Sequence, residues 1–126
     1  MNFKDQVTSL WEDMDKQNWD KLYGYFHDEA IIKWNNTNEQ FNVREFVRAN
    51  SEYPGAWSIK VERLECIGNL VVSVVLVQLK EDDLSFHATS FFEFSKDKIK
   101  ALNEYWGEDG KAPQWRIDKG IGKPIR

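Results

Sequence analysis

The spacing of apolar residues changes part-way along this chain, from a helical period in the first 50 residues to a β period in most of the rest. Between residues 3 and 16 the apolar side chains recur every three or four positions, which predicts an amphipathic helix. The apolar stripe consists of Phe3, Val7, Leu10, Trp11 and Met14. A similar spacing follows Asn18, a residue type that caps helices, and predicts a second helix that ends at the polar turn 27–29. These two helices should form a hairpin.

A short hairpin and a third helix are expected next. β-type residues begin at Ala30, and the run of turn-forming residues at 35–39 predicts that the chain reverses direction there. Asn42 and Glu45 have the spacing of a capping box, in which two residues satisfy each other's backbone N–H groups at the start of a helix. The third helix should therefore start there and stop before the Pro-Gly pair at 54–55.

Residues 57–106 have the pattern of four long strands separated by polar turns, which predicts an antiparallel meander. The strands are expected at 57–67, 70–79, 84–94 and 99–106. The strand at 70–79 carries apolar residues on both faces, whereas an antiparallel strand with one face in water alternates. Three helices can cover one face of the sheet. The outer face is expected to meet a second copy of the chain in an isologous homodimer, with a tail folded over the sheet as the alternative.

Composition limits the classes of protein to which the chain can belong. Its 126 residues fit one domain, with a core at about 3–107 and a C-terminal tail at 108–126. The net charge of −4 comes from interspersed acidic and basic residues, unlike the basic face of a nucleic-acid-binding protein. The longest apolar run is far shorter than the roughly 20 residues of a membrane helix, so no membrane partner is expected.

The cysteine content and the absence of known motifs exclude several kinds of site. A single cysteine, Cys66, excludes an internal disulfide, and the sequence has no paired Cys and His spacing typical of metal sites. Cys66 is expected to be a small buried hydrophobe, and a reducing cytoplasm is the expected location. No phosphate-binding loop, nucleophile elbow or zinc motif is present, so no cofactor and no metal is predicted.

One carboxylate stands among large apolar residues in the last predicted strand. Alternation along the strand places Leu102, Glu104 and Trp106 on one face. A carboxylate in such surroundings is paired, shifted in pKa, or turned toward a cavity that a ligand enters. It could act as an acid or base, bind an amine, or pair with Arg63. The opposite face, with Tyr105, is nearly as suitable for burial, so alternation alone does not choose between the two faces.

Several local sequences and the order of the elements point to a known family. The local sequences are Trp19-Asp20-Lys21-Leu22, Tyr25-Phe26-His27-Asp28-Glu29-Ala30, Lys98-Ile99 and Glu104-Tyr105-Trp106. Together with three helices, a hairpin before the third and a four-stranded meander, they resemble the NTF2-like superfamily and, within it, the SnoaL-like (polyketide cyclase-like) group. The resemblance implies an α+β cone, in which three N-terminal helices pack on a curved, mostly antiparallel sheet around a cavity. It also implies a homodimer, and a Glu104 that looks into the cavity.

The catalytic residues of enzymes in this superfamily are not matched at the corresponding positions. In the ketosteroid isomerase branch, the general base falls near Trp34 and the two oxyanion donors near Leu10 and Ser90, and none of these is the required residue. The Asp-Arg-Asp set of the epoxide hydrolase branch cannot be assembled from the expected cavity residues. SnoaL-like cyclases use an acidic residue near the end of the fold, and Glu104 could be its analogue.

The expected site and its function follow from this register. Glu104 is the candidate catalytic residue, His87 is expected on the opposite face of its strand, and the predicted ligand-binding residues are Trp34, Asn36, Ser90, Phe92, Leu102 and Trp106. The favoured function is a non-catalytic protein that binds a small, largely apolar molecule in an aromatic-lined cavity.

Two other functions remain open. One is a cofactor-independent isomerase, cyclase or lyase in which Glu104 moves a proton on a carbonyl-bearing substrate. The other is a protein-interaction module, which would have a filled cavity and an exposed apolar patch. The missing isomerase residues favour the ligand-binding protein over the enzyme.

Overall fold

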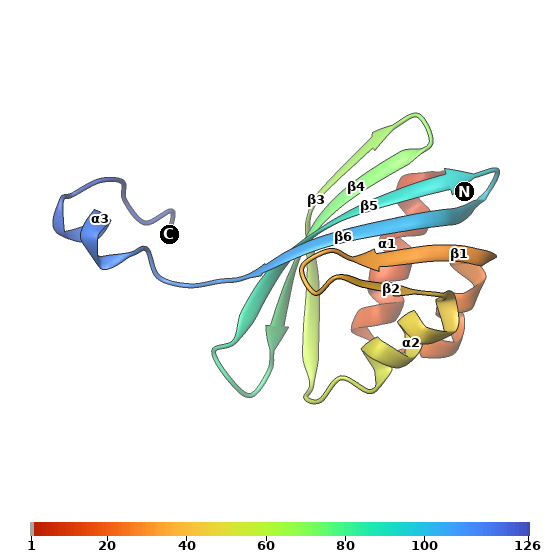
Figure 1. Ribbon diagram of the computed structural model, residues 1–126, viewed down its shortest axis with the longest axis horizontal. Helices are drawn as coiled ribbons and strands as arrows, with labels where there is room; N and C mark the ends of the chain where they lie inside the picture. Colours follow the sequence, from red (N-terminus) through yellow and green to blue (C-terminus); the bar gives the residue numbers. More distant parts are fainter. Residues whose placement is uncertain (1) are drawn as a thin grey trace.

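The fold is a six-stranded sheet with the N-terminal helices on one side of it (Figure 1). The structure, a computed structural model, describes residues 2–126. Its elements are α1 (Phe3–Asp15), the 3-10 helix η1 (Trp19–Tyr25), β1 (Phe26–Trp34), β2 (Glu39–Phe41), α2 (Val43–Ser51), β3 (Trp57–Ile67), β4 (Leu70–Leu79), β5 (Ser85–Ser95), β6 (Lys98–Glu108) and α3 (Gln114–Asp118). The strand order is β2-β1-β6-β5-β4-β3, in which β1 and β6 are parallel and the other neighbours antiparallel. This is the expected α+β architecture.

The N-terminal helices form where the sequence supplies caps and an apolar stripe. The Asn2 side chain accepts a hydrogen bond from the Asp5 backbone N–H at 2.8 Å and starts α1. Val7 and Leu10, on the inner face of that helix, are completely buried. The second segment is a 3-10 helix rather than an α-helix, and it ends just before Phe26. With α2 and the C-terminal α3, residues 2–126 contain four helices, so the expectation of three N-terminal helices is met in part.

The strand β1 begins at Phe26, so the expected polar turn at 27–29 is wrong. His27 lies within the strand, with its Nε2 atom 2.8 Å from the backbone oxygen of Ser95. The register between β1 and β6 shifts between Phe26 and Ile31, and this irregularity leaves the polar side chains near the surface. A turn-like composition therefore does not exclude a strand whose partner lies far away in the sequence.

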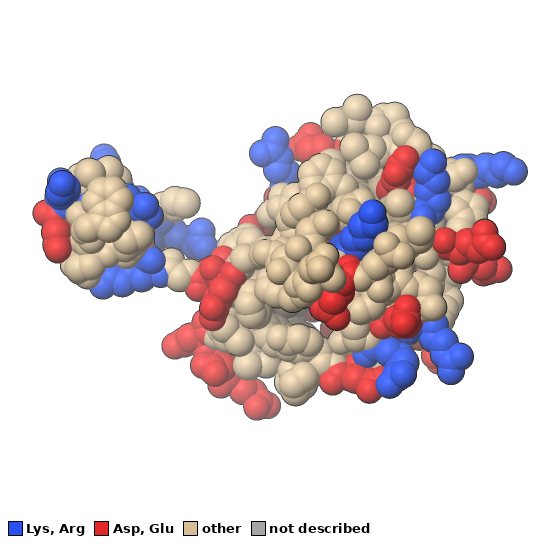
Figure 2. All heavy atoms as spheres, in the orientation of Figure 1, with Lys and Arg blue, Asp and Glu red and all other residues tan. Residues whose placement is uncertain are grey.

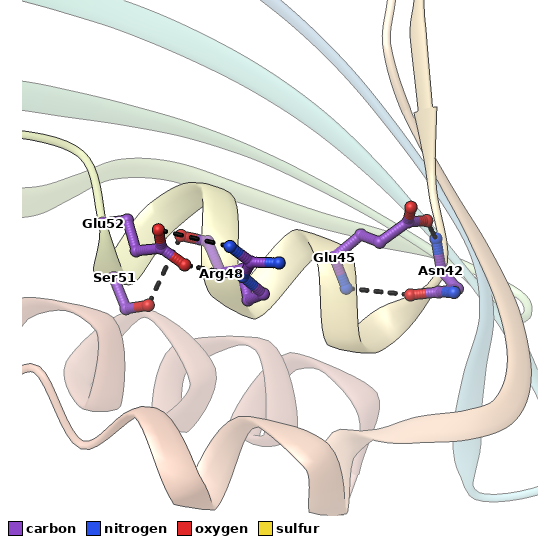
Figure 3. A network of polar contacts seen from close by, with 5 residues as sticks. All are labelled: Asn42, Glu45, Arg48, Ser51 and Glu52. Carbon is purple, nitrogen blue, oxygen red and sulfur yellow. Dashed lines mark hydrogen bonds and ion pairs between the residues drawn. The ribbon is translucent and has the colours of Figure 1, made fainter.

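The helix α2 has side-chain contacts with its flanking residues at both ends (Figure 3). Asn42 and Glu45 form the expected capping box, in which each side chain accepts a hydrogen bond from the other's backbone N–H at 2.8 and 2.9 Å. At the far end Arg48 pairs with Glu52 one turn later. Phe46, on the inner side, is 1% exposed, so α2 contributes to the same core as α1.

Alternation along the strands separates an inner face, which packs on the helices, from an outer face. On β4, Val71 and Val75 are fully buried on the inner face. On β6, Leu102 and Glu104 are buried whereas Tyr105 is 49% exposed. Glu104 therefore lies on the inner face of the last strand, as the resemblance implied.

The outer face of the sheet carries apolar residues that the rest of the chain leaves partly uncovered. They lie mainly on β4, β5 and β6 and include Leu70, Val72, Val74, Leu76, Phe91 and Tyr105. The Phe91 and Tyr105 rings make an edge-to-face contact with centroids 5.9 Å apart. The strand β4 is thus apolar on both faces, as expected, and its outer face has the composition of a surface that packs against another one.

Residues 110–126 form an arm that projects away from the sheet (Figure 1). The arm carries α3 and exposes large apolar side chains, namely Trp115, Ile117, Ile121 and Ile125. Its basic side chains gather at a distance from the body of the protein (Figure 2). The alternative in which the tail folds back over the sheet of its own chain is therefore wrong.

The β3–β4 hairpin extends beyond the helices, and this changes the environment of Cys66. The residue lies near the end of β3 and is exposed, so the expectation that it is buried is wrong. Its neighbour Ile67 is 69% exposed, because no helix reaches this end of the sheet. Within residues 2–126, none of the helices has both the length and the apolar character needed to cross a membrane.

Candidate functional site

A cavity of about 300 Å³ lies between the helices and the inner face of the sheet. Its walls come from α1, η1, the end of α2, the α2–β3 loop and strands β1, β3, β4, β5 and β6. Five of the six tryptophans in the chain contribute to these walls, namely Trp11, Trp19, Trp34, Trp57 and Trp106. Such a concentration of indole rings makes the surface of the cavity largely aromatic.

One wall of the cavity is a continuous series of aromatic contacts. The ring of Tyr53 lies 5.4 Å from that of Trp57, which lies 5.9 Å from Phe86, which in turn lies 6.0 Å from Trp106. These centroid distances are within the range in which aromatic pairs attract each other. The series runs from the α2–β3 loop across β3 and β5 to β6, so four parts of the chain hold the wall in place.

The carboxyl group of Glu104 is held by its two register partners in the sheet. β6 lies between β1 and β5, and Trp34 and Ser90 are the residues opposite Glu104 on these two strands. Trp34 donates its indole N–H to Oε1 of Glu104 at 2.9 Å, and Ser90 donates its hydroxyl to Oε2 at 2.5 Å. Both carboxyl oxygens of Glu104 are therefore oriented by fixed donors.

The electrostatic surroundings of Glu104 favour its neutral form. Its side chain is 6% exposed, and burial raises the pKa of Glu104 because the ionised carboxylate loses its hydration. The hydrogen bonds from Ser90 and Trp34 act in the opposite direction, since both favour the ionised form. Arg63, one expected partner, instead pairs with Glu65 at 3.2 Å. No Lys, Arg or His belongs to the cavity walls in the described part of the chain.

The mouth of the cavity lies at the α2–β3 loop, where the lining side chains are more exposed. Tyr53 is 50% exposed there. The indole N–H of Trp57 donates to the backbone oxygen of Pro54 at 3.0 Å and fixes the ring at the rim. Gly55 has a φ of 101°, and a Cβ atom on it would lie 2.5 Å from Cδ1 of Leu79. The loop therefore requires glycine at this position.

The structure brings together four of the seven residues predicted for the site. Trp34, Glu104 and Trp106 line the cavity. Ser90 is fully buried and reaches the cavity through its hydrogen bond to Glu104. Whether these residues bind a ligand stays a prediction, but their mutual arrangement is that of one site.

The other three predicted residues lie elsewhere. Phe92 and Leu102 are on the expected face of the sheet but are 0% and 1% exposed, and they belong to the closed core rather than to the cavity wall. The ring of Trp11, 6.1 Å from that of Phe92, covers the sheet at this level. Asn36 is exposed, and its amide bonds both the backbone N–H and the backbone oxygen of Trp106, at 2.8 and 2.6 Å. It ties the β1–β2 turn to β6 instead of facing the cavity.

Several cavity residues were not predicted from the sequence. Trp11 is expected there only as part of a helix core, and Trp19, Tyr53, Trp57 and Phe86 have no predicted role in the site. The available signal was the content of six tryptophans in 126 residues. Composition alone does not distinguish core, pocket and interface, so it could not assign these residues.

A second polar cluster lies on the outer face of the sheet. His87 bonds Glu62 through Nε2 at 2.9 Å and Asp109 through Nδ1, and Asp109 also accepts a hydrogen bond from the Ser85 hydroxyl at 2.6 Å. The hydrogen bond to Asp109 contributes most to raising the pKa of His87. The prediction that His87 faces away from the cavity is confirmed. In the described residues no group of three His, Cys, Asp or Glu side chains could hold a metal ion.

Comparisons with known proteins give matches at the level of structure. No protein-family model and no curated protein matches the chain. A protein from Kribbella flavida DSM 17836, described as a candidate ketosteroid isomerase, matches with a TM-score of 0.83 at 18% identity, over 98% of this chain and 89% of that one. An NTF-2 like protein of unknown function from Burkholderia xenovorans LB400 matches with a TM-score of 0.80 at 19% identity, over 97% and 94%. The chain has the NTF2-like fold.

A third structural match is a complex with a small molecule. A protein of ketosteroid isomerase-like fold from Catenulispora acidiphila DSM 44928, in complex with trimethylamine, has a TM-score of 0.69 at 9% identity, over 79% of this chain and 83% of that one. In this protein, Trp34 and Ser90 lie near the positions at which the resemblance places the isomerase base and an oxyanion donor. Both residues instead bond Glu104, so the polar centre of this NTF2-like cavity is a carboxyl group on β6.

Proposed function

We propose that this chain is a ligand-binding protein whose cavity takes a small, largely apolar molecule. The observation that carries the proposal is the cavity of about 300 Å³, with five tryptophans around one buried carboxyl group. This volume is at the lower end of the range for small-molecule pockets. Indole rings supply a broad apolar contact surface, and a single polar group at the inner end is sufficient to orient a ligand.

The structural neighbours support a pocket role in general terms. One neighbour, of ketosteroid isomerase-like fold, is in complex with trimethylamine, and another is described as a candidate ketosteroid isomerase. Identities of 9% and 18% carry the fold to this chain and not the ligand. The proposal therefore rests on the cavity of this chain, and one neighbour supplies an example of a similar fold in complex with a small molecule.

An isomerase, cyclase or lyase that uses Glu104 as an acid or base is the second candidate. The raised pKa of Glu104 favours it, because a proton-transfer group is most effective when its pKa is close to the working pH. One observation speaks against the enzyme. Among the described residues of the cavity walls, the only ionisable group besides Glu104 that could take or return the proton is Tyr53, which lies near the mouth. The ligand-binding function needs no such partner and is therefore preferred.

Native mass spectrometry of the freshly purified protein, followed by titration with the neutral dye Nile red, tests the ligand-binding function. We expect either a retained small molecule or saturable dye binding, with quenching of the cavity tryptophans. Ala88→Phe, which fills part of the cavity, should weaken dye binding, while Lys4→Gln on the exposed side of α1 should not. Absence of both a retained molecule and dye binding would contradict the proposal and favour a protein-interaction module.

We also propose that the outer face of the sheet is the interface of a homodimer. The partly exposed apolar residues of β4, β5 and β6 lie on this one face, and burying them against a second copy removes them from water. The arm is expected to add to the interface, since it exposes Trp115, Ile117 and Ile121 and lies outside the body of its own chain. Val74→Lys at the centre of the face should shift the protein to monomers in analytical ultracentrifugation.

Composition also bears on other partners and on location. The net charge of −4 gives no reason to propose a nucleic-acid partner. The cytoplasmic location expected from the single cysteine remains a prediction.

A further inference from the structure

The buried carboxyl group of Glu104 has hydrogen-bond donors but no counter-charge. It is 6% exposed, and none of the described residues that line the cavity is basic. A buried carboxylate is normally paired with a cation, because removing it from water is costly. Either Glu104 keeps its proton in the empty cavity, or the missing cation is supplied by what binds there.

The donors around Glu104 are arranged for an ionised carboxylate. The indole N–H of Trp34 can only donate, so Oε1 must accept. The Ser90 hydroxyl donates a hydrogen bond to the other oxygen, Oε2, at 2.5 Å. Hydrogen bonds to both oxygens lower the cost of ionising the group and fix its orientation. The site therefore holds an acceptor whose negative charge can be formed at moderate cost when a positive charge arrives.

The aromatic walls offer ring surface and few free hydrogen-bond donors. The indole N–H groups of Trp11, Trp34 and Trp57 are already bonded to Ser73, Glu104 and Pro54. These three side chains therefore have no free N–H to offer a ligand, and their share of the cavity wall is ring carbon with its π-electrons. Tryptophan is the best of the aromatic residues at attracting a cation over its ring, and cages of aromatic rings bind alkylated ammonium ions.

We propose that the ligand of this cavity is an alkylated ammonium ion, with its charge facing the Glu104 carboxylate and its alkyl groups against the surrounding indole rings. This inference rests on the proposed ligand-binding function and names the class of ligand. An anion is disfavoured by Glu104, and a neutral carbonyl or hydroxyl compound would leave the aromatic cage without a role specific to charge. An ammonium ion uses both features of the site.

Binding of such an ion is coupled to the loss of a proton from Glu104. In the empty cavity burial raises the pKa of Glu104, and a bound cation lowers it again because the two charges attract. The other titratable side chain of the cavity walls is Tyr53 in the α2–β3 loop, and α1, η1 and strands β1, β3, β4 and β5 contribute none among the described residues. The affinity for a permanent cation should therefore rise with pH and level off once Glu104 is ionised. The affinity for a neutral ligand that accepts a hydrogen bond from protonated Glu104 should fall instead.

Choline and its uncharged isostere 3,3-dimethylbutan-1-ol are a matched pair of probes for this inference. Both have the same shape and one hydroxyl, and they differ in a quaternary nitrogen against a quaternary carbon. Isothermal titration calorimetry of the full chain from pH 5 to pH 8 should show choline binding at least tenfold more tightly than the alcohol at pH 8. Repeating the titration at low pH in two buffers of different ionisation enthalpy should show proton release with choline alone.

Two variants distinguish the effect of the Glu104 charge on binding from the effect of the protein's total charge. Glu104→Gln keeps the shape of the side chain and should weaken choline binding at least tenfold while leaving the alcohol unaffected. Glu93→Gln, on the outer face beside Lys100, removes the same charge away from the cavity and should change neither affinity. Because the pH profile of the unaltered protein is informative by itself, the test does not depend on either variant folding.

The possible outcomes distinguish this inference from the proposed function. Tight choline binding that rises with pH and is lost in Glu104→Gln supports both. Equal or tighter binding of the alcohol overturns the ammonium ligand and leaves the ligand-binding function intact. Failure of choline, the alcohol and Nile red to bind, with no small molecule retained in native mass spectrometry, overturns both.

Discussion

At the scale of single residues, Glu104 works against the stability of the fold that contains it. Its side chain is 6% exposed in a largely aromatic cavity, and the hydrogen bonds from Trp34 and Ser90 offset part of the desolvation. Proteins retain such groups at functional sites, where activity needs an arrangement that costs stability. This cost in stability should be measurable as a pH dependence of the free energy of unfolding.

The sign of this dependence follows from the raised pKa of Glu104. In the unfolded chain the carboxyl group ionises near its ordinary value of 4.5, whereas the native state holds the proton to higher pH. The native state binds more protons between these two values, so the free energy of unfolding falls as the pH rises through this window. Glu104→Gln stays neutral and lacks this loss. The variant should be more stable than the unaltered protein at pH 7, by on the order of 1 kcal/mol.

Urea unfolding of both proteins from pH 4 to pH 8 measures this effect. The two free energies of unfolding should be similar at pH 4 and diverge as the pH rises. Because the His87 cluster is present in both proteins, its own pH dependence cancels in the difference. A constant difference across the pH range would show that Glu104 is not the group responsible.

The residue scale also shows what the sequence could and could not predict about the site. Alternation, combined with the family resemblance, correctly placed Leu102 and Glu104 on the inner face. It could not give depth along the strand, which is decided by where α1 crosses the sheet and by the ring of Trp11 that covers Phe92. The contact between Trp34 and Glu104, 70 residues apart, depends on the pairing of β1 with β6. No local pattern encodes that pairing.

At the scale of the elements, α2 depends on its cap. It is nine residues long, a length at which isolated helices are marginal in water, and its end supplies Asn50 and Ser51 to the cavity wall. Asn42→Ala removes the side-chain acceptor of the capping box and should lower the free energy of unfolding by about 1 kcal/mol. The midpoint of urea unfolding measures this, with Asn42→Asp as the matched control.

Asn42→Asp keeps an oxygen that can accept the bond from the Glu45 backbone and should stay close to the unaltered protein. Glu52→Gln breaks the exposed pair with Arg48 at the other end of α2 and should leave the midpoint nearly unchanged, because exposed ion pairs contribute little. If Glu52→Gln lowered the midpoint more than Asn42→Ala does, the ion pair rather than the cap would be the contact that stabilises the helix.

Elements defined by local signals were predicted well, and elements defined by distant partners were not. The capping box at Asn42, the helix at 3–15 and the strands at 57–67 and 70–79 carry their signals within a few residues. The start of β1 is different, since its polar residues 27–29 read as a turn until the parallel pairing with β6 is known. Parallel neighbours are always distant in sequence, so this error has a physical cause.

At the scale of the whole molecule, the arm and the rest of the chain differ in charge, and this bears on the proposed homodimer. The arm at 110–126 holds five basic side chains and one acidic, whereas the rest of the chain holds twelve basic and twenty acidic. Opposite charges on two parts that do not pack within one chain favour contact between chains. In the proposed homodimer, the exposed apolar residues of the arm and its positive charge are therefore expected to meet the partner subunit.

Deleting residues 110–126 tests this arrangement and leaves Asp109 bonded to His87 and Ser85 at the root of the arm. We expect the dissociation constant of the dimer to rise at least tenfold in analytical ultracentrifugation. Unfolding of the monomer at high dilution should not change, because Trp115, Ile117 and Ile121 contribute little to the core of their own chain. Salt should weaken the full-length dimer more than the truncated one, since the charge of the arm is screened within about 10 Å at 0.1 M. A truncated chain that dimerises as tightly as the full-length chain would restrict the interface to the sheet, and loss of the folded monomer would show that the arm belongs to the domain.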